Sequence, residues 1–291
     1  MGSLDKMKIK KRIALQYYKL KFFLLGLLVP KKTSRIAFEL FCTPYSGKPK
    51  RTVPSIFEHT ETIELLTEGN IVLRGWCWKP EEELSNGKKI LILHGFDSCA
   101  YKFEKYIRPL KKEGFMVYAF DAPGHGISDG KTINSLQYKN AILKMEEKFG
   151  EFYGMMAHSI AGLAVSLATE KLTNLQKLVL IAPAVEITRP IESFARMVGL
   201  SKKLKELFYG HIIAIGGYPI SYYDSRIAMK KSSIETLWLH DKKDNICPFE
   251  DVEPLLNSKP EHITFYITNG LGHCNIYRET STIKKIVNFF V

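Results

Sequence analysis

The pattern of apolar and polar positions divides the chain into a helical beginning and a body in which strands and helices alternate. Two segments, 61–66 and 71–78, alternate apolar with polar residues and are separated by a turn signal at Glu68-Gly69-Asn70, so they predict a β-hairpin. Short continuous apolar runs then alternate with helical patterns, which predicts an α/β fold with a mostly parallel, doubly wound sheet. The predicted strands are 89–94, 115–120, a short one after Gly150, 178–182, 236–240 and 262–268, and the predicted helices include 103–113, 133–149 and 282–290.

The alternation stops between residues 183 and 234. This excursion is too long for an ordinary connection and contains helical fragments at 192–197 and 202–208. We therefore predict a small helical cap inserted before the penultimate strand. The predicted organisation is a leader and connector over 1–58, an α/β core over 59–184 and 234–291, and the cap over 185–233.

Residues 6–29 have an apolar residue every three or four positions and lysines between them, which predicts an amphipathic basic helix. Its continuous apolar run, 22–29, is too short to cross a hydrocarbon core of about 30 Å at about 1.5 Å per residue. Two interpretations remain open, namely a helix lying on an anionic membrane surface and a helix packed on the protein body. A secretory signal peptide is disfavoured, because Pro30-Lys31-Lys32 stands where small residues would mark cleavage.

Charge is concentrated in the same region. The net charge is +12, and residues 1–51 contribute thirteen basic and two acidic side chains, which leaves the other 240 residues nearly neutral. A basic surface over the whole domain, as nucleic-acid binding requires, is not indicated. The five cysteines are unclustered, so neither a disulfide framework nor a zinc site is predicted and a reducing compartment is favoured. We expect a cytoplasmic protein, peripheral on the inner face of a membrane if the leader binds lipid; the sequence does not indicate an oligomeric state.

Polar residues follow the buried strands at the points where the strands end, and in parallel sheets ligands bind at that edge. Ser159 is the most informative of them, since it stands between a strand and a helix with Ala157 and Ala161 two positions away on either side. Small residues at these positions let the backbone turn sharply and expose the hydroxyl, as in a nucleophile elbow. The usual pattern is G-x-S-x-G, and alanines replace both glycines here. A buried helix start with a serine N-cap explains the local pattern equally well.

The rest of the chain supports the first interpretation. From about residue 60 to residue 291 the sequence resembles the α/β-hydrolase superfamily, most of all the lipase-, esterase- and serine-aminopeptidase-like serine hydrolases that carry D-x-x-G-H-G-x-S. The matching motifs, in chain order, are H-G-F at 94–96, D-A-P-G-H-G-I-S at 121–128, the Ser159 turn, D-N-I-C-P at 244–248 and G-L-G-H at 270–273.

The resemblance implies a role for each matching residue. Ser159 is the expected nucleophile, His273 its general base, and Asp244 the acid that orients the imidazole. The backbone N–H groups of Phe96 and Ile160 are the expected oxyanion donors. No cofactor and no metal is expected.

Other polar residues near these motifs receive lesser roles. Asp241 competes with Asp244, and we expect it to be a solvated loop charge. His94 and His125 are expected to organise loops by hydrogen bonding, and His158 to be a packing residue.

The implied function is hydrolysis of a carboxylic ester through an acyl-enzyme intermediate, on a small-molecule acyl substrate. Aromatic residues in the cap favour an apolar, lipid-derived acyl group. The alternatives are a catalytically silent scaffold that binds a membrane or a partner, and an acyltransferase, thioesterase or peptidase of the same fold.

Overall fold

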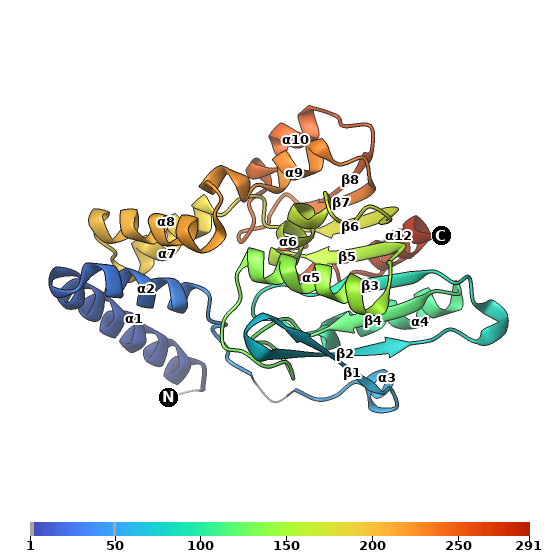
Figure 1. Ribbon diagram of the computed structural model, residues 1–291, viewed down its shortest axis with the longest axis horizontal. Coiled ribbons are helices and arrows are strands. Elements are labelled where there is room, and N and C mark those ends of the chain that lie inside the picture. The colour runs from blue at the N-terminus through green and yellow to red at the C-terminus, as the bar shows by residue number, and fades with distance from the viewer. Residues whose placement is uncertain (1–2, 49–50) are drawn as a thin grey trace. The chain divides into compact units, whose positions relative to one another are not determined.

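The computed structural model describes residues 3–48 and 51–291, with side chains described from residue 12 on. The chain forms two compact units, one of residues 1–43 with 187–222 and the other of residues 44–186 with 223–291 (Figure 1). The structure thus groups the helices of the leader with most of the insertion, whereas the sequence pattern separates them. We call the first the helical unit and the second the sheet unit.

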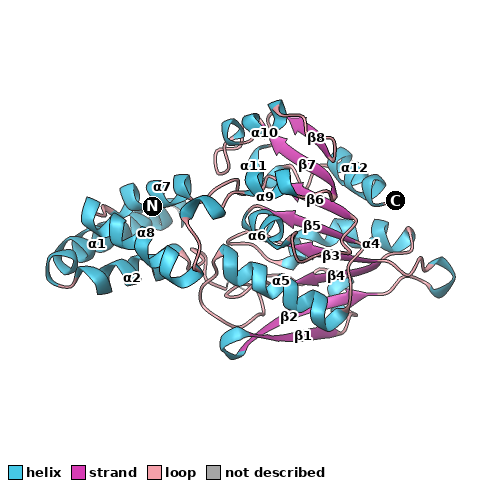
Figure 2. Ribbon diagram, turned by 45° about the horizontal axis from the view of Figure 1, so that its top comes forward, coloured by secondary structure: helices cyan, strands magenta, loops and turns pink. Residues whose placement is uncertain are grey.

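The sheet unit contains one eight-stranded sheet in the order β1-β2-β4-β3-β5-β6-β7-β8 (Figure 2). Strand β2 is antiparallel to both of its neighbours, and all other pairs are parallel, so the mostly parallel sheet predicted from the sequence is confirmed. The strands are β1 (Thr62–Thr67), β2 (Ile71–Trp78), β3 (Lys89–Leu93), β4 (Met116–Phe120), β5 (Gly154–His158), β6 (Lys177–Ile181), β7 (Glu235–Asp241) and β8 (Ile263–Thr268).

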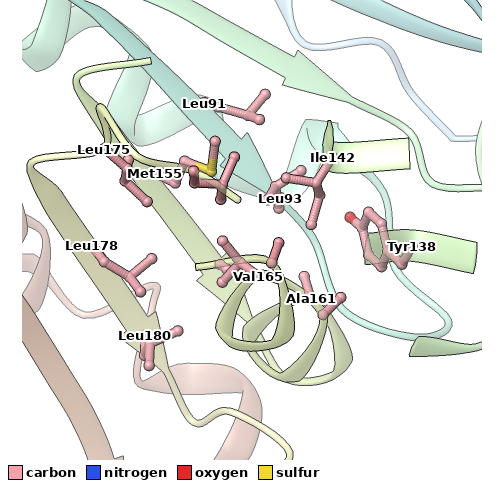
Figure 3. Close-up of a cluster of buried hydrophobic side chains, with 14 of the residues drawn as sticks. Leu91, Leu93, Tyr138, Ile142, Met155, Ala161, Val165, Leu175, Leu178 and Leu180 are labelled. Atoms are coloured by element: carbon pink, nitrogen blue, oxygen red, sulfur yellow. The ribbon is translucent and has the colours of Figure 1, made fainter. Parts of the chain in front are cut away.

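Both faces of the sheet are covered, which is why its central strands are apolar throughout. In β3, Leu91 and Leu93 pack on one face with side chains from α5 (Ser135–Phe149) and α6 (Ile160–Ala168), as Figure 3 shows. Ile90 and Ile92 pack on the other face with α4 (Glu104–Lys112) and α12 (Thr280–Phe290). Shorter helices complete the unit: α3 (Ser55–Glu58), α9 (Ser225–Lys231), α10 (Glu253–Asn257), α11 (Gly272–Asn275), and the 3₁₀ turns η1 (Glu68–Asn70), η2 (Glu82–Leu84), η3 (Ala100–Phe103) and η5 (Phe249–Asp251).

The helical unit joins the first two helices of the chain to the helices of the insertion. Its elements are α1 (Ser3–Leu28), α2 (Pro30–Phe41), α7 (Thr188–Val198), α8 (Lys202–Gly216) and the 3₁₀ turn η4 (Ile220–Tyr222). Aromatic rings hold it together: Phe41 lies 5.7 Å from Phe208 and 5.2 Å from Phe194, centroid to centroid. The leader is therefore part of a folded helical core.

The predicted helix over 6–29 corresponds to α1, which has two apolar faces. One face is buried at Phe22 and packs toward α2 and α7. The other carries Tyr17, Phe23 and Leu27, which are all exposed. The side chains of Lys6, Lys8, Lys10 and Lys11 lie outside the described residues. None of the described helices combines the length and apolarity needed to cross a membrane.

These two faces give a test with adjacent residues. Phe22 is fully buried and Phe23 is 63% exposed. We expect Phe22→Ala to lower the free energy of unfolding of the helical unit by about 3–5 kcal/mol, because truncating a buried aromatic leaves a cavity, and Phe23→Ala to leave it nearly unchanged. Urea unfolding followed by circular dichroism, with limited proteolysis of α1, measures both. Equal destabilisation by the two variants would contradict the described packing of α1.

Candidate active site

Ser159 lies at the carboxyl end of β5, directly before α6, on a sharp turn. Its backbone angles are φ 57° and ψ −122°, a conformation that residues with a side chain rarely adopt. The turn is held on both sides, because the Ser159 N–H donates to the Ile181 carbonyl (3.1 Å) and the Ser159 carbonyl accepts from the N–H groups of Gly162 (2.9 Å) and Ala184 (3.0 Å). The strand–turn–helix context expected around Ser159 is therefore present.

The turn closes despite the two alanines. Ala157 and Ala161 are fully buried and fit within the packed core. The closest approaches are made elsewhere: a Cβ on Gly95 would lie 2.8 Å from Ser159 Cβ, and a Cβ on Gly162 would lie 2.6 Å from Pro183 Cβ. Gly95 and Gly162 therefore supply the space that the usual pattern obtains from its own glycines.

The structure brings Asp244 and His273 together from the segments that follow β7 and β8. The His273 Nδ1–H donates to Asp244 Oδ2 at 2.7 Å. The other carboxylate oxygen accepts from the backbone N–H groups of Ile246 and Cys247, both at 2.8 Å. Burial favours the protonated acid, but these hydrogen bonds, the one to His273 foremost, hold the pKa of Asp244 below its ordinary value. Asp244 is thus an ionised, fixed acceptor for the imidazole.

Ser159 lies beside this pair without a direct bond to it. Among the described residues there is no hydrogen bond between the Ser159 hydroxyl and the His273 ring; unliganded sites often have this contact long. Two neighbours connect the groups. His158 has its ring 4.7 Å from that of His273 and donates from Nε2 to the His273 carbonyl (3.1 Å). The Ser159 side chain also lies near the Cys247 thiol, whose pKa burial raises and the serine partly lowers.

One expected oxyanion donor, the N–H of Ile160, follows the Ser159 turn directly. The other, the N–H of Phe96, lies in the loop after β3. Ile160 is the first residue of α6, where backbone N–H groups have no intrahelical acceptor. Within the described part of the chain, no hydrogen bond uses the N–H of Phe96 or of Ile160. Both donors are therefore available to an anionic oxygen.

The motif at 121–128 is a scaffold for this loop. His94 Nε2 accepts from the Ala122 N–H (2.9 Å) and His125 Nε2 from the Asp97 N–H (3.0 Å), while both Nδ1–H groups donate to carbonyls. Asp121 accepts from the N–H groups of Ala100 (2.8 Å) and Ile127 (3.0 Å). Burial lowers the pKa of both histidines, so they stay neutral at pH 7. The structure therefore places His94 and His125 as loop organisers.

Asp241 differs from the prediction of a solvated loop charge. It is fully buried, and its carboxylate accepts hydrogen bonds from Thr268 Oγ1 (2.6 Å) and from the N–H groups of Lys243 (2.8 Å), Leu271 (2.9 Å) and Gly270 (3.1 Å). Burial alone would raise the pKa of Asp241, but these bonds outweigh it and lower the pKa well below 3.8. Asp241 ties the end of β7 to the loop that carries His273.

Two further histidines support the Asp244–His273 pair. His240 is fully buried, and its Nε2–H donates to the Cys247 carbonyl (2.7 Å) and lies 3.9 Å from Asp244 Oδ2. Burial lowers the pKa of His158 to about 3, helped by the neighbouring His273, so His158 stays neutral. The sequence signal for both was their place at or next to the end of a buried strand, close to the motif residues.

The described residues contain no group of three or more His, Cys, Asp or Glu side chains arranged to hold a metal ion. The chemistry that the arrangement supports is that of a serine hydroxyl beside a histidine–carboxylate pair, with two free N–H donors nearby.

Comparison with known proteins finds similarity to hydrolases. Residues 85–214 match the sequence model of the family described as serine aminopeptidase, S33. This range contains Phe96, the 121–128 motif and Ser159, and ends before Asp244 and His273. The chain is 26% identical to the monoglyceride lipase of Rattus norvegicus over 174 residues, which are 55% of this chain and 54% of that protein. The chain thus matches about half the length of this curated relative.

Solved structures resemble the chain over most of its length. An esterase of Pyrococcus furiosus superposes with a TM-score of 0.60 and 20% identity, covering 85% of this chain and 96% of that one. Est1E from Butyrivibrio proteoclasticus, solved with ferulic acid bound, has a TM-score of 0.60 and 18% identity, with 78% and 95% covered. With the strand order, these similarities show that the chain has the α/β-hydrolase fold.

The buried Asp241 carboxylate gives a pH-dependent prediction. Its pKa is lower in the folded protein than its ordinary 3.8, so it stabilises the fold fully above that pH and loses this contribution as the pH falls toward the folded pKa. We expect Asp241→Asn to cost about 1–3 kcal/mol at pH 7, since an amide N–H₂ replaces one acceptor. The difference in free energy of unfolding between Asp241→Asn and wild type should become smaller below about pH 4.

Urea unfolding at pH 7 and at several values between about pH 4 and pH 2.5 measures this difference. Glu250→Gln, an exposed carboxylate on the same segment, is the matched control and should change little at either end of the range. If the loss of stability in Asp241→Asn does not vary with pH, the negative charge of Asp241 is not what stabilises the fold.

Proposed function

We propose that this protein belongs to the α/β-hydrolase superfamily and hydrolyses carboxylic esters with Ser159 as nucleophile, His273 as general base and Asp244 as the orienting acid. The observation that carries the proposal is the conjunction of Ser159 on its strained turn with the 2.7 Å hydrogen bond between His273 and Asp244. The names of its relatives, a monoglyceride lipase and esterases, support ester chemistry.

The proposed reaction has two halves. The Ser159 Oγ attacks the ester carbonyl carbon while His273 Nε2 takes its proton, and the charged imidazole is stabilised by the Asp244 carboxylate. The tetrahedral intermediate expels the alcohol, which receives that proton, and leaves an acyl group on Ser159. Water, deprotonated by His273, then attacks the acyl-enzyme; the bond between the acyl carbon and Ser159 Oγ breaks, His273 returns the proton to Oγ, and the carboxylic acid is released.

The oxygen that becomes negative in both halves needs donors. The N–H groups of Phe96 and Ile160 are proposed for this role, because neither is used within the described protein and Ile160 begins a helix, where partial positive charge favours an anion. One such donor typically contributes about 10²–10³-fold to kcat. The neutral His94 and His125 hold the loop without placing a competing charge beside it.

An apolar, lipid-derived acyl ester is the proposed substrate class. The rat relative is named a monoglyceride lipase, and the helical unit has an apolar surface suited to lipid. That surface is the outer face of α1, which we define by its exposed apolar residues Ile13, Tyr17, Leu20, Phe23, Leu24, Leu27 and Leu28.

We propose that this outer face of α1 rests on an anionic membrane surface. Leu27 and Leu28 are more than 70% exposed, which is costly in water for leucine side chains in a folded helix. Exposed basic residues border the face, namely Arg12 at its start and Lys31 and Lys32 just beyond its end. Apolar side chains flanked by basic ones match the interface of an anionic bilayer.

The nucleophile is tested by covalent labelling. We expect wild type to react with a fluorophosphonate probe and Ser159→Ala not to react, while Ser166→Ala, which changes a buried serine of the following helix α6, reacts like wild type. Asp244→Asn should retain the fold and lower kcat by roughly 10⁴-fold, because the imidazole loses the acceptor that fixes its tautomer.

Hydrolysis of p-nitrophenyl esters, compared with amino-acid p-nitroanilides, separates an esterase from a peptidase. Lack of labelling in wild type would favour the silent scaffold.

The membrane contact is tested by point changes on the outer face, since deleting α1 would disturb the helical core. We expect wild type to sediment with phosphatidylserine-containing vesicles and Phe23→Ser/Leu27→Ser to stay in the supernatant with its activity on p-nitrophenyl acetate intact. Leu84→Ser, an exposed leucine of the sheet unit, is the control. Undiminished sedimentation of the double variant would contradict the proposal. If wild type is a dimer and the double variant is a monomer, the outer face of α1 binds a second copy of the chain instead.

A further inference from the structure

Asp97, the residue after the proposed oxyanion donor Phe96, has an unusual backbone. Its φ is 56°, in the left-handed region that favours glycine, although aspartate and asparagine tolerate it better than most residues. A non-glycine residue in this conformation persists only where the surroundings hold it. The loop at Phe96 is therefore kept in its shape by contacts outside itself.

The contacts come from a segment fifty residues earlier. The Ser46 N–H donates to Asp97 Oδ1 (2.9 Å) and the Ser46 hydroxyl donates to Asp97 Oδ2 (2.7 Å), so both carboxylate oxygens are engaged by one residue. On its other side, the Asp97 N–H donates to His125 Nε2 (3.0 Å). Asp97 is thus fixed through its side chain and its main chain at once.

Neighbouring residues of the same segment reinforce this pairing. The Tyr45 ring packs edge-on against the Phe96 ring, 5.5 Å between centroids, and Phe96 packs in the same way on His125 at 5.7 Å. Lys48 Nζ donates to the carbonyl of Ser128, the last residue of the 121–128 motif. Residues 45–48, which we call the clasp, therefore contact both Phe96 and the loop that supports it.

We infer that Ser46 and Asp97 are positioning residues that aim the Phe96 N–H at the oxyanion. An oxyanion donor acts only when it is held close to the productive geometry. His94, Gly95 and Phe96 lie between the end of β3 and Asp97, so the conformation of Asp97 sets the direction in which this short stretch leaves the sheet. Release of Asp97 to an ordinary negative φ would rotate the adjoining peptide and move the donor. This inference rests on the proposed function.

A merely structural role predicts something different. The clasp hydrogen bonds are at the surface, and their loss would then lower stability slightly and leave turnover unchanged. Asn86 offers a matched control, because it also fastens an exposed loop of the sheet unit with two hydrogen bonds, to the Glu113 carbonyl and from the Lys88 N–H, both at 2.9 Å. It precedes β3, whereas the clasp contacts the loop after β3.

The experiment compares Ser46→Ala, Asp97→Asn, Ser46→Thr and Asn86→Ala with wild type on p-nitrophenyl acetate. Ser46→Ala and Asp97→Asn should lower kcat by about tenfold or more, toward the 10²–10³-fold that loss of a whole oxyanion donor produces, with KM nearly unchanged. Affinity for a trifluoromethyl ketone, whose serine adduct bears the oxyanion, should fall by a similar factor. Ser46→Thr keeps the hydroxyl and should have the kcat and the ketone affinity of wild type. Asn86→Ala should change neither kcat nor this affinity.

Two failures are distinguishable. Wild type that neither hydrolyses the ester nor reacts with the fluorophosphonate would overturn the proposed function and the clasp's role with it. Wild type that is active, with Ser46→Ala and Asp97→Asn matching it in kcat and in affinity for the ketone, would overturn the clasp alone. A loss in those two variants that Asn86→Ala shares would assign the effect to general stability and also overturn it.

Discussion

The turn at Ser159 can form only where three stretches of backbone approach one another closely. A side chain at Gly95 would meet Ser159, and one at Gly162 would meet Pro183. These contacts join the loop after β3, the turn after β5 and the segment after β6, which are neighbours because β3, β5 and β6 are adjacent in the sheet. The position where the strand order changes direction thus becomes the place where a serine hydroxyl is presented.

Most hydrogen bonds of the buried polar groups around this turn are made with the main chain, and within the described residues His158 Nδ1 and His240 Nδ1 have no partner. His94, His125 and Asp241 each fasten one loop at the carboxyl edge of the sheet, and burial keeps the two histidines neutral. Such pairing matters because an unsatisfied polar group in the interior costs about 1–3 kcal/mol. Among the described side chains, His273 is the one that forms a hydrogen bond with the Asp244 carboxylate.

The sequence predicts the sheet well because each central strand is apolar on both faces and each connection begins or ends at a polar or glycine signal. It also predicts that Asp244 and His273 meet, since both follow strands at one edge. It does not predict that Asp241 is buried, because two aspartates three residues apart look alike until the loop after β8 supplies donors to one of them. The periodicity of α1 does not show that this helix has two apolar faces. One face packs within the helical unit and the other is exposed.

The chain passes between its two units at residues 43/44, 186/187 and 222/223, and residues close to the first two of these points contact the loops of the proposed site. After the first, Ser46 is bonded to Asp97 beside Phe96. Before the second, the Ala184 N–H donates to the carbonyl of Ser159. Glu186, which precedes the insertion, and Asp224, which follows it, form an antiparallel β-bridge. All of these contacts lie within the sheet unit. There, the hydrogen bonds that fix Ser46 and Ala184 also hold the loops that carry Phe96 and Ser159, so one set of hydrogen bonds shapes both sides of the proposed site.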